Sequence, residues 1–317
     1  MGEAKMKRRA HAAILAAHPS CIYCGGIHPA DTIEHMPPIA MFDGRQRPKG
    51  LEFPTCRDCN NGTSLSDMAA SLLGRMYPDA RTPDELIRLL RGVRNNIPGL
   101  LEEMDGVGQK LTERGIPSMP AGAGKLRVDG PILNKHITVF GAKLGLALHY
   151  EAHRSPLPPA GGVQPMFFTN VSALRDELPI ELIQLLPTPR TLKQGKREVS
   201  DQFKYSWALT EEKRHSVFYA TFRQSFAIAA VTALDRSEYL EHNADKYPIT
   251  IPGAFKTQTL IASARLFPPP WTAEETETCF IVRDHKGQAL TYVYFEEGPG
   301  RQAAANLLTR DEARRIA

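Results

Sequence analysis

The sequence predicts a mixed α+β fold, in which a metal-stabilised module precedes a domain of helices and antiparallel hairpins. Two CxxC pairs stand close together near the N-terminus, and helical patterns follow them. A stretch rich in Gly and Pro then leads into a second half where strand patterns flank polar turns. We therefore expect a module with flanking helices at residues 1–97, a connector at 98–131 and an α+β domain at 132–317.

The composition is typical of a soluble globular protein. Of the 317 residues, 42% are hydrophobic and 23% are charged, which argues against a globally disordered chain. No apolar run approaches the roughly 20 residues that a membrane span needs, so we expect no membrane partner. The formal net charge of +4 is mildly basic and permits nucleic-acid binding without establishing it.

The cysteines predict a metal site. Cys21 and Cys24 form one CxxC pair, and Cys56 and Cys59 form the other. Two such pairs can hold one ion from two tight turns and close a tetrahedral thiolate shell, so we expect a structural zinc ion; a redox pair is the alternative. Metal-bound thiolates fit a reducing compartment, and we expect a cytoplasmic protein. Cys279 lies in a strand-like run, where a small buried hydrophobe is expected.

An acid and an imidazole lie side by side between the two cysteine pairs. Glu34 and His35 are followed, one residue later, by two prolines, which forbid a helix and favour an extended exit. Asn60 comes directly after the last cysteine of the second pair. A carboxylate next to an imidazole inside such a loop indicates a catalytic site.

The succession CxxC, EHxPP and CxxCN resembles the zinc-stabilised branch of the HNH endonucleases, over roughly residues 15–70. The resemblance implies a ββα-metal nuclease fold in which His35 is the general base that activates water. It also implies that Glu34 and Asn60 hold one divalent cation, and Ser64 lies where some members carry another ligand. The wider pattern is similar to bacterial HNH proteins of unknown biological role, and a nuclease of a bacterial defence system or a mobile element is one possibility that stays open.

One part of the family pattern is missing. The middle Asn, which helps to orient the base, has no clear match in residues 47–52, so we expect a backbone carbonyl to orient His35 instead. Phosphodiester hydrolysis needs a base for water and a cation that neutralises charge on the phosphate. Because a carboxylate and an amide are hard oxygen ligands, magnesium or manganese is expected at Glu34 and Asn60, and zinc at the thiolates.

Nucleic acid is the expected partner, with DNA as the expected substrate. Four cations near the expected site are predicted to contact its backbone: Arg45, Arg47, Lys49 and Arg57. A protein partner or a homo-oligomer stays open. Two other interpretations also stay open: an inactive zinc-knuckle module that binds nucleic acid or protein, and a nuclease subunit that is active only with a partner.

The remaining elements follow from caps and periodicity. A basic helix is expected before the first CxxC pair, and a helix after the second pair should run to about Met76. Thr82 and Pro83 signal the start of the next helix, and a short amphipathic piece is expected at 100–104.

The second half is expected to combine helices and hairpins. Helices are predicted at 140–150, 176–186 and 301–317, and a strand at 165–169. Two hairpins are predicted, one from 203–209 and 215–222, the other from 279–282 and 289–295, with a further apolar run at 226–234.

Overall fold

The computed structural model describes residues 3–76, 83–105, 126–238, 240, 244, 247–256, 272–283, 289–295 and 308–316. Within them the fold is mixed α+β with antiparallel sheets, as the sequence predicts. The chain divides into two compact units, residues 1–262 and 263–317. None of the described helices has both the length and the apolar character that crossing a bilayer requires.

The first unit begins with an α-helix, a small hairpin whose strands are joined through two 3-10 helices, and two further α-helices. These elements are α1 (Glu3–Ala17), β1 (Thr32–His35), η1 (Ile39–Met41), η2 (Asp43–Arg45), β2 (Glu52–Thr55), α2 (Arg57–Gly62) and α3 (Ser64–Arg75). Strands β1 and β2 pair antiparallel, with His35 opposite Glu52. The helix predicted after the second CxxC pair is present as two helices, because Thr63 leaves helical geometry with φ −108° and ψ 2°.

The longest helix of the unit is α6 (Pro131–His153), which follows α4 (Pro83–Asn96) and α5 (Leu100–Asp105). It begins earlier than the predicted 140–150 because its first turn is well capped. Pro131 stands at the start of the helix, and the Glu103 carboxylate of α5 accepts hydrogen bonds from the backbone nitrogens of Ile132 (2.9 Å) and Leu133 (2.8 Å). An anionic cap at this positive helix end stabilises a start that local sequence does not reveal.

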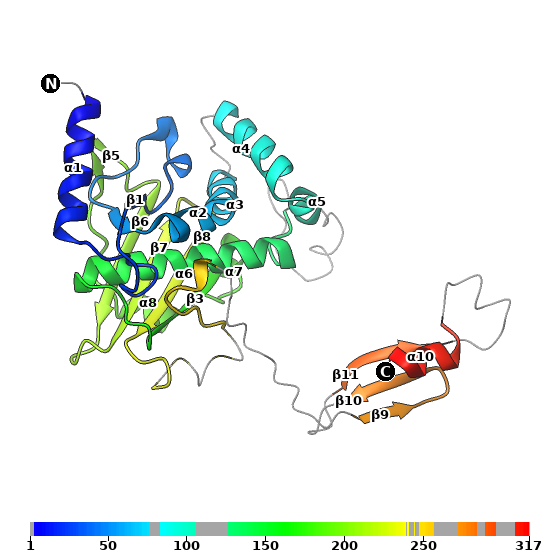
Figure 1. Cartoon of the computed structure of the whole chain (residues 1–317). Helices are drawn as coiled ribbons and strands as arrows, with labels where there is room; N and C mark the ends of the chain where they lie inside the picture. Colours follow the sequence, from blue (N-terminus) through cyan, green and yellow to red (C-terminus); the bar gives the residue numbers. More distant parts are fainter. Residues whose placement is uncertain are drawn as a thin grey trace. The chain divides into compact units, whose positions relative to one another are not determined.

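Helix α6 lies across one face of a four-stranded antiparallel sheet (Figure 1). The strand order is β3 (Gly162–Thr169), β8 (Phe226–Ala233), β7 (His215–Phe222) and β6 (Phe203–Leu209). The β6–β7 hairpin has the predicted bounds, and the apolar run at 226–234 is the inner strand β8, buried at every residue. The strand predicted at 165–169 begins three residues earlier.

Two glycines let α6 approach the sheet closely. A Cβ at Gly145 would come within 2.6 Å of the Val163 Cγ2, and one at Gly141 within 2.9 Å of the Pro165 Cβ. Because real Cβ contacts are longer than this, both positions need a residue without a side chain. The pair lies one helical turn apart and marks the stripe of α6 that touches β3.

The predicted helix at 176–186 is shorter than expected. The structure has α7 (Asn170–Leu174) and α8 (Ile180–Gln184) instead, because Asp176 between them adopts a left-handed φ of 54°. A two-residue strand pair, β4 (Lys193–Gln194) and β5 (Arg197–Glu198), and the short η5 (Ala254–Lys256) complete the described elements of this unit.

A buried ion network joins the hairpin region to the four-stranded sheet. The Asp43 Oδ1 lies 3.0 Å from the Arg75 Nη1 and 2.9 Å from the Arg223 Nη2, and Arg75 also reaches the Glu85 Oε2 at 2.6 Å. Gln202 joins the network by accepting hydrogen bonds from the Asp43 backbone nitrogen and from Arg223. These contacts place η2, α3, α4 and the sheet in one packed unit.

The second unit contains a three-stranded antiparallel sheet and a helix. Its described elements are β9 (Thr272–Glu275), β10 (Cys279–Arg283), β11 (Ala289–Tyr294) and α10 (Arg310–Ile316). The predicted hairpin of β10 and β11 is confirmed, and Cys279 is buried as expected. Residues 301–307 of the predicted C-terminal helix, and residues 106–125 of the predicted connector, lie outside the described residues.

Replacing Gly145 by Ala should lower the free energy of unfolding by about 1–3 kcal/mol, because the new methyl group overpacks the contact with Val163. Gly92→Ala on α4 is the matched control, since its Cβ would meet only the flexible end of Met68 at 3.3 Å. That change should raise stability by about 0.5–1 kcal/mol through helix propensity. Urea unfolding measures the free energy of unfolding of both variants. An equal change in the two would contradict the close approach of α6 to the sheet.

Candidate metal centre

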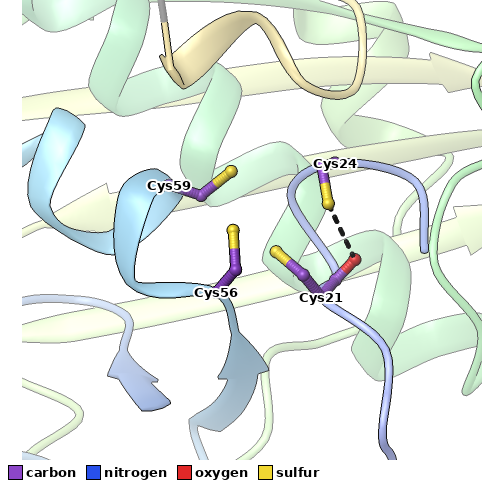
Figure 2. Close-up of side chains that lie close together, drawn as sticks. All are labelled: Cys21, Cys24, Cys56 and Cys59. Atoms are coloured by element: carbon purple, nitrogen blue, oxygen red, sulfur yellow. Dashed lines mark hydrogen bonds between the residues drawn. The ribbon is translucent and has the colours of Figure 1, made fainter. Parts of the chain in front are cut away.

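The four cysteines of the two CxxC pairs come together in the structure, as the sequence predicts. Their sulfur atoms all lie within 4.8 Å of one another, and all four residues are buried. Figure 2 shows the Cys21 and Cys24 side chains, on one loop, facing those of Cys56 and Cys59 at the start of α2. Four sulfurs at this spacing form a ligand set that could hold a structural zinc ion.

Two features position these sulfurs. The loop of the first pair is fastened to the hairpin, because the Ile22 backbone nitrogen donates to the Pro54 carbonyl (3.1 Å). Gly25, which follows Cys24, has a left-handed φ of 67°, and a Cβ there would lie 3.0 Å from the Leu157 carbonyl oxygen. The second pair is placed by β2, which ends immediately before Cys56.

The crowded thiols do not titrate independently. Hydrogen bonds from the thiols of Cys21 and Cys59 lower the pKa of Cys24 to about 2, and the contact with Cys24 raises the pKa of Cys21 to about 12. Contacts with Cys21 and Cys24 likewise raise the pKa of Cys59. When Cys24 is a thiol it can donate to the Cys21 carbonyl oxygen at 3.9 Å, the dashed line in Figure 2. A divalent cation would let all four sulfurs bind as thiolates.

Glu34 and His35, the predicted ligand and base, point to opposite sides of β1, as neighbouring strand residues do. Glu34 is 7% exposed. Its Oε1 accepts a hydrogen bond from the His35 backbone nitrogen (2.8 Å), and its Oε2 lies 3.1 Å from the Lys143 Nζ. A fixed ammonium therefore stands beside the carboxylate for which the resemblance implies a divalent cation.

Lys143 reaches this position from α6 and is completely buried. Its Nζ lies 2.5 Å from the Asp67 Oδ2 as well as beside Glu34, and it sits 5.9 Å from the centre of the Tyr23 ring. Burial disfavours the ammonium, but the charges of Asp67 and Glu34 outweigh that effect and raise the pKa of Lys143. Burial raises the pKa of Asp67 to about 6, although Lys143 opposes the shift.

His35 lies at the end of β1, next to two residues, Glu52 and His11, that the sequence analysis does not predict as part of the site. Its Nε2 is 3.5 Å from the Glu52 Oε1, and its ring centre is 5.7 Å from that of His11. Glu52, opposite His35 in the hairpin, therefore contacts the imidazole that a backbone carbonyl was expected to orient. The cross-strand register could have revealed Glu52, whereas His11 lies on α1 and no local signal points to it.

The other predicted site residues are distributed around the hairpin. Asn60 on α2 donates from Nδ2 to the Thr32 Oγ1 at 3.5 Å, so its described contact lies two residues before Glu34 on the same face of β1. Ser64 opens α3. Of the four predicted nucleic-acid contacts, Arg47 is only 14% exposed and lies 3.3 Å from the Glu52 Oε1. The exposed ones are Arg45, Lys49 and Arg57.

Replacing Lys143 by Met should lower the free energy of unfolding by about 3–5 kcal/mol, because two buried carboxylates lose their cation. The loss should be larger at pH 8 than at pH 5. Burial already raises the pKa of Asp67, and loss of the ammonium that opposes this shift raises it further, so Asp67 takes up a proton on mild acidification and its repulsion with Glu34 disappears. Lys135→Met, at an exposed position of the same helix, is the control and should be nearly neutral. Denaturant unfolding at both pH values measures the losses. Equal losses for the two variants would show that the contacts of Lys143 with Glu34 and Asp67 do not stabilise the fold.

Comparison of the chain with protein-family models, with curated proteins and with solved structures found no match. The four-cysteine cluster is thus the part of the family pattern that the structure supports directly.

Proposed function

We propose that the chain is a metal-dependent endonuclease that hydrolyses phosphodiester bonds of nucleic acid, with DNA as its substrate. The observation that carries this proposal is the position of His35. It ends the first strand of a hairpin that leads directly into a helix, and four cysteines gather at the base of that hairpin. The same order of strand, strand and helix is what the resemblance to the HNH endonucleases implies.

His35 is proposed as the general base. Glu52 lies beside its Nε2, and a carboxylate there stabilises the imidazolium that forms when the ring accepts a proton from water. Because Nε2 faces Glu52, we assign proton abstraction to Nδ1. The His35 side chain is 20% exposed, so water can reach it.

Magnesium or manganese is proposed to be held by Glu34 and Asn60, and when bound it would neutralise charge that develops on the phosphate. Both residues offer hard oxygen ligands. Glu34, however, already contacts Lys143 and the His35 backbone nitrogen, and the Asn60 side-chain amide donates to Thr32. An ion at this position would therefore have to share Glu34 with the ammonium.

Three exposed cations support nucleic acid as the substrate. Arg45 ends η2, Lys49 precedes β2 and Arg57 opens α2, so all three lie on segments in or next to the hairpin. Exposed cations of this kind neutralise phosphates without selecting a base sequence. A cytoplasmic location, where the four thiols stay reduced, agrees with this activity.

A second candidate is a zinc-knuckle module that binds nucleic acid or protein without cleaving it. The observation in its favour is Lys143, whose ammonium supplies a fixed positive charge to Glu34. A partner-dependent nuclease would share the same geometry. Cleavage by the isolated chain separates the proposed enzyme from both.

The test is cleavage of supercoiled plasmid by purified protein with magnesium or manganese. Wild type should cut, EDTA should stop it, and His35→Ala should be slower by at least about 100-fold, since a general base contributes roughly that much. His28→Ala is the matched control, because His28 is an exposed histidine away from the hairpin end, and it should cut like wild type.

Two results would overturn the proposal. One is cutting by His35→Ala at the wild-type rate, which would point to a contaminating nuclease or another base. The other is no cutting by a folded chain that carries one equivalent of zinc at its four cysteines, which would favour the binding module or the partner-dependent enzyme.

A further inference from the structure

We propose that His11, His35 and Glu52 together bind one divalent transition-metal ion, at a site separate from the four cysteines. The three residues come from three elements: α1, the end of β1 and the start of β2. Each offers one ligand atom, and these atoms all lie within 4.8 Å of one another. The proposal rests on this convergence and needs no nuclease activity.

The described distance between the His35 and Glu52 ligand atoms is the one that a shared ion would require. Two ligand atoms that each lie about 2.1 Å from an ion, at a tetrahedral angle, are about 3.4 Å apart. The His35 Nε2 and the Glu52 Oε1 are 3.5 Å apart. The His11 and His35 ring centres, at 5.7 Å with a tilt of 57°, leave room for both imidazoles to point toward one centre.

The environment of His11 also supports a metal ion at this position. Its Nε2 is buried, and it finds no hydrogen-bond partner in the part of the chain that the structure describes. A buried ring nitrogen without a partner costs free energy, and an ion at the centre of the three residues would satisfy it. The His11 side chain itself is only partly buried, and Glu52 is 29% exposed, so an ion can enter from solvent.

The ligand set selects the kind of metal. Two imidazoles and one carboxylate suit zinc and other late divalent ions of the first transition row, whereas magnesium prefers a shell of oxygens. With three protein ligands, the ion keeps at least one position for water or a phosphate oxygen. This differs from the four-sulfur cluster, which would leave no open position.

Arg47 contacts one of the three proposed ligands, Glu52. Its Nη2 lies 3.3 Å from the Glu52 Oε1, the oxygen that also faces His35. The guanidinium fixes the carboxylate and lowers its negative charge density, so it should weaken binding without removing the ligand. Both contacts fall on Oε1, so an ion bound through this oxygen would share it with the guanidinium.

A regulatory consequence follows, and this step alone rests on the proposed function. An imidazole that binds an ion through one nitrogen carries its proton on the other and cannot accept another proton. Zinc bound to His35 would therefore stop it from acting as a base. Excess zinc should slow magnesium-dependent cleavage, because the ion competes for the residue that activates water.

The experiment is a binding titration of the full chain after the cysteine site has been loaded with one equivalent of zinc. Wild type should bind one further equivalent of cobalt, and its visible spectrum should lack the charge-transfer bands of thiolate ligands. His11→Ala and Glu52→Gln should each weaken this second equivalent by more than about 100-fold, since removal of a ligand exceeds the loss caused by an outer contact. His28→Ala should bind like wild type.

Circular dichroism identifies any variant that fails to fold, and His11→Gln then replaces His11→Ala. The proposal is overturned if the zinc-loaded wild type binds no further ion, if folded His11 variants bind it undiminished, or if the bands show thiolate ligation. Absence of plasmid cleavage would overturn the proposed function only, because the stoichiometry is measured without substrate.

Discussion

The convergence of four cysteine sulfurs at the base of the β1–β2 hairpin is the constraint on which the N-terminal geometry depends. The hairpin has four paired residues on each strand, too few to be stable alone. One ion bound by both CxxC pairs would fasten the loop before β1 to the helix after β2. It would thereby fix the far end of the hairpin, where His35 and Glu52 face each other. Structural zinc of this kind contributes about 10–16 kcal/mol in small domains, enough to determine whether such a hairpin forms.

Lys143 adds the second constraint, and it connects distant parts of the chain. A completely buried ammonium is tolerated because Glu34 and Asp67 surround it, so α6 is bound electrostatically to β1 and α3. The Asp43, Arg75 and Arg223 network does the same for η2, α3 and the sheet. The hairpin and its helix are thus parts of a larger packed unit. Any divalent ion at Glu34 has to compete with a cation that the fold already supplies.

Much of this architecture could be predicted because its signals are local. Two strand-like runs around a polar turn predicted the bounds of β6 and β7, and the cysteine spacing predicted the four-sulfur cluster. Helix boundaries were predicted less well where they depend on residues distant in the sequence or on an unusual backbone conformation. The start of α6 depends on the Glu103 cap from another helix, and the break at Asp176 depends on a left-handed backbone that the sequence pattern does not indicate.

Some residues of the candidate site could likewise be predicted from local signals, and others could not. The motif identified His35 and Glu34, but no pattern connects His35 with His11 or Glu34 with Lys143, because these contacts arise only when α1 and α6 pack on the hairpin. Glu52 is an intermediate case, since pairing the two short strands places it opposite His35. Catalysis itself stays a prediction, because it depends on how an ion, water and substrate meet at these residues.

The most direct test of this account is X-ray absorption at the zinc edge, on protein that carries one equivalent of zinc per chain. The account predicts a shell of four sulfur atoms at about 2.3 Å, with Cys56→Ser reducing the sulfur count and destabilising the hairpin unit. A shell dominated by nitrogen and oxygen, or a chain that folds unchanged without any metal, would contradict the claim that the four cysteines hold the ion on which this geometry depends.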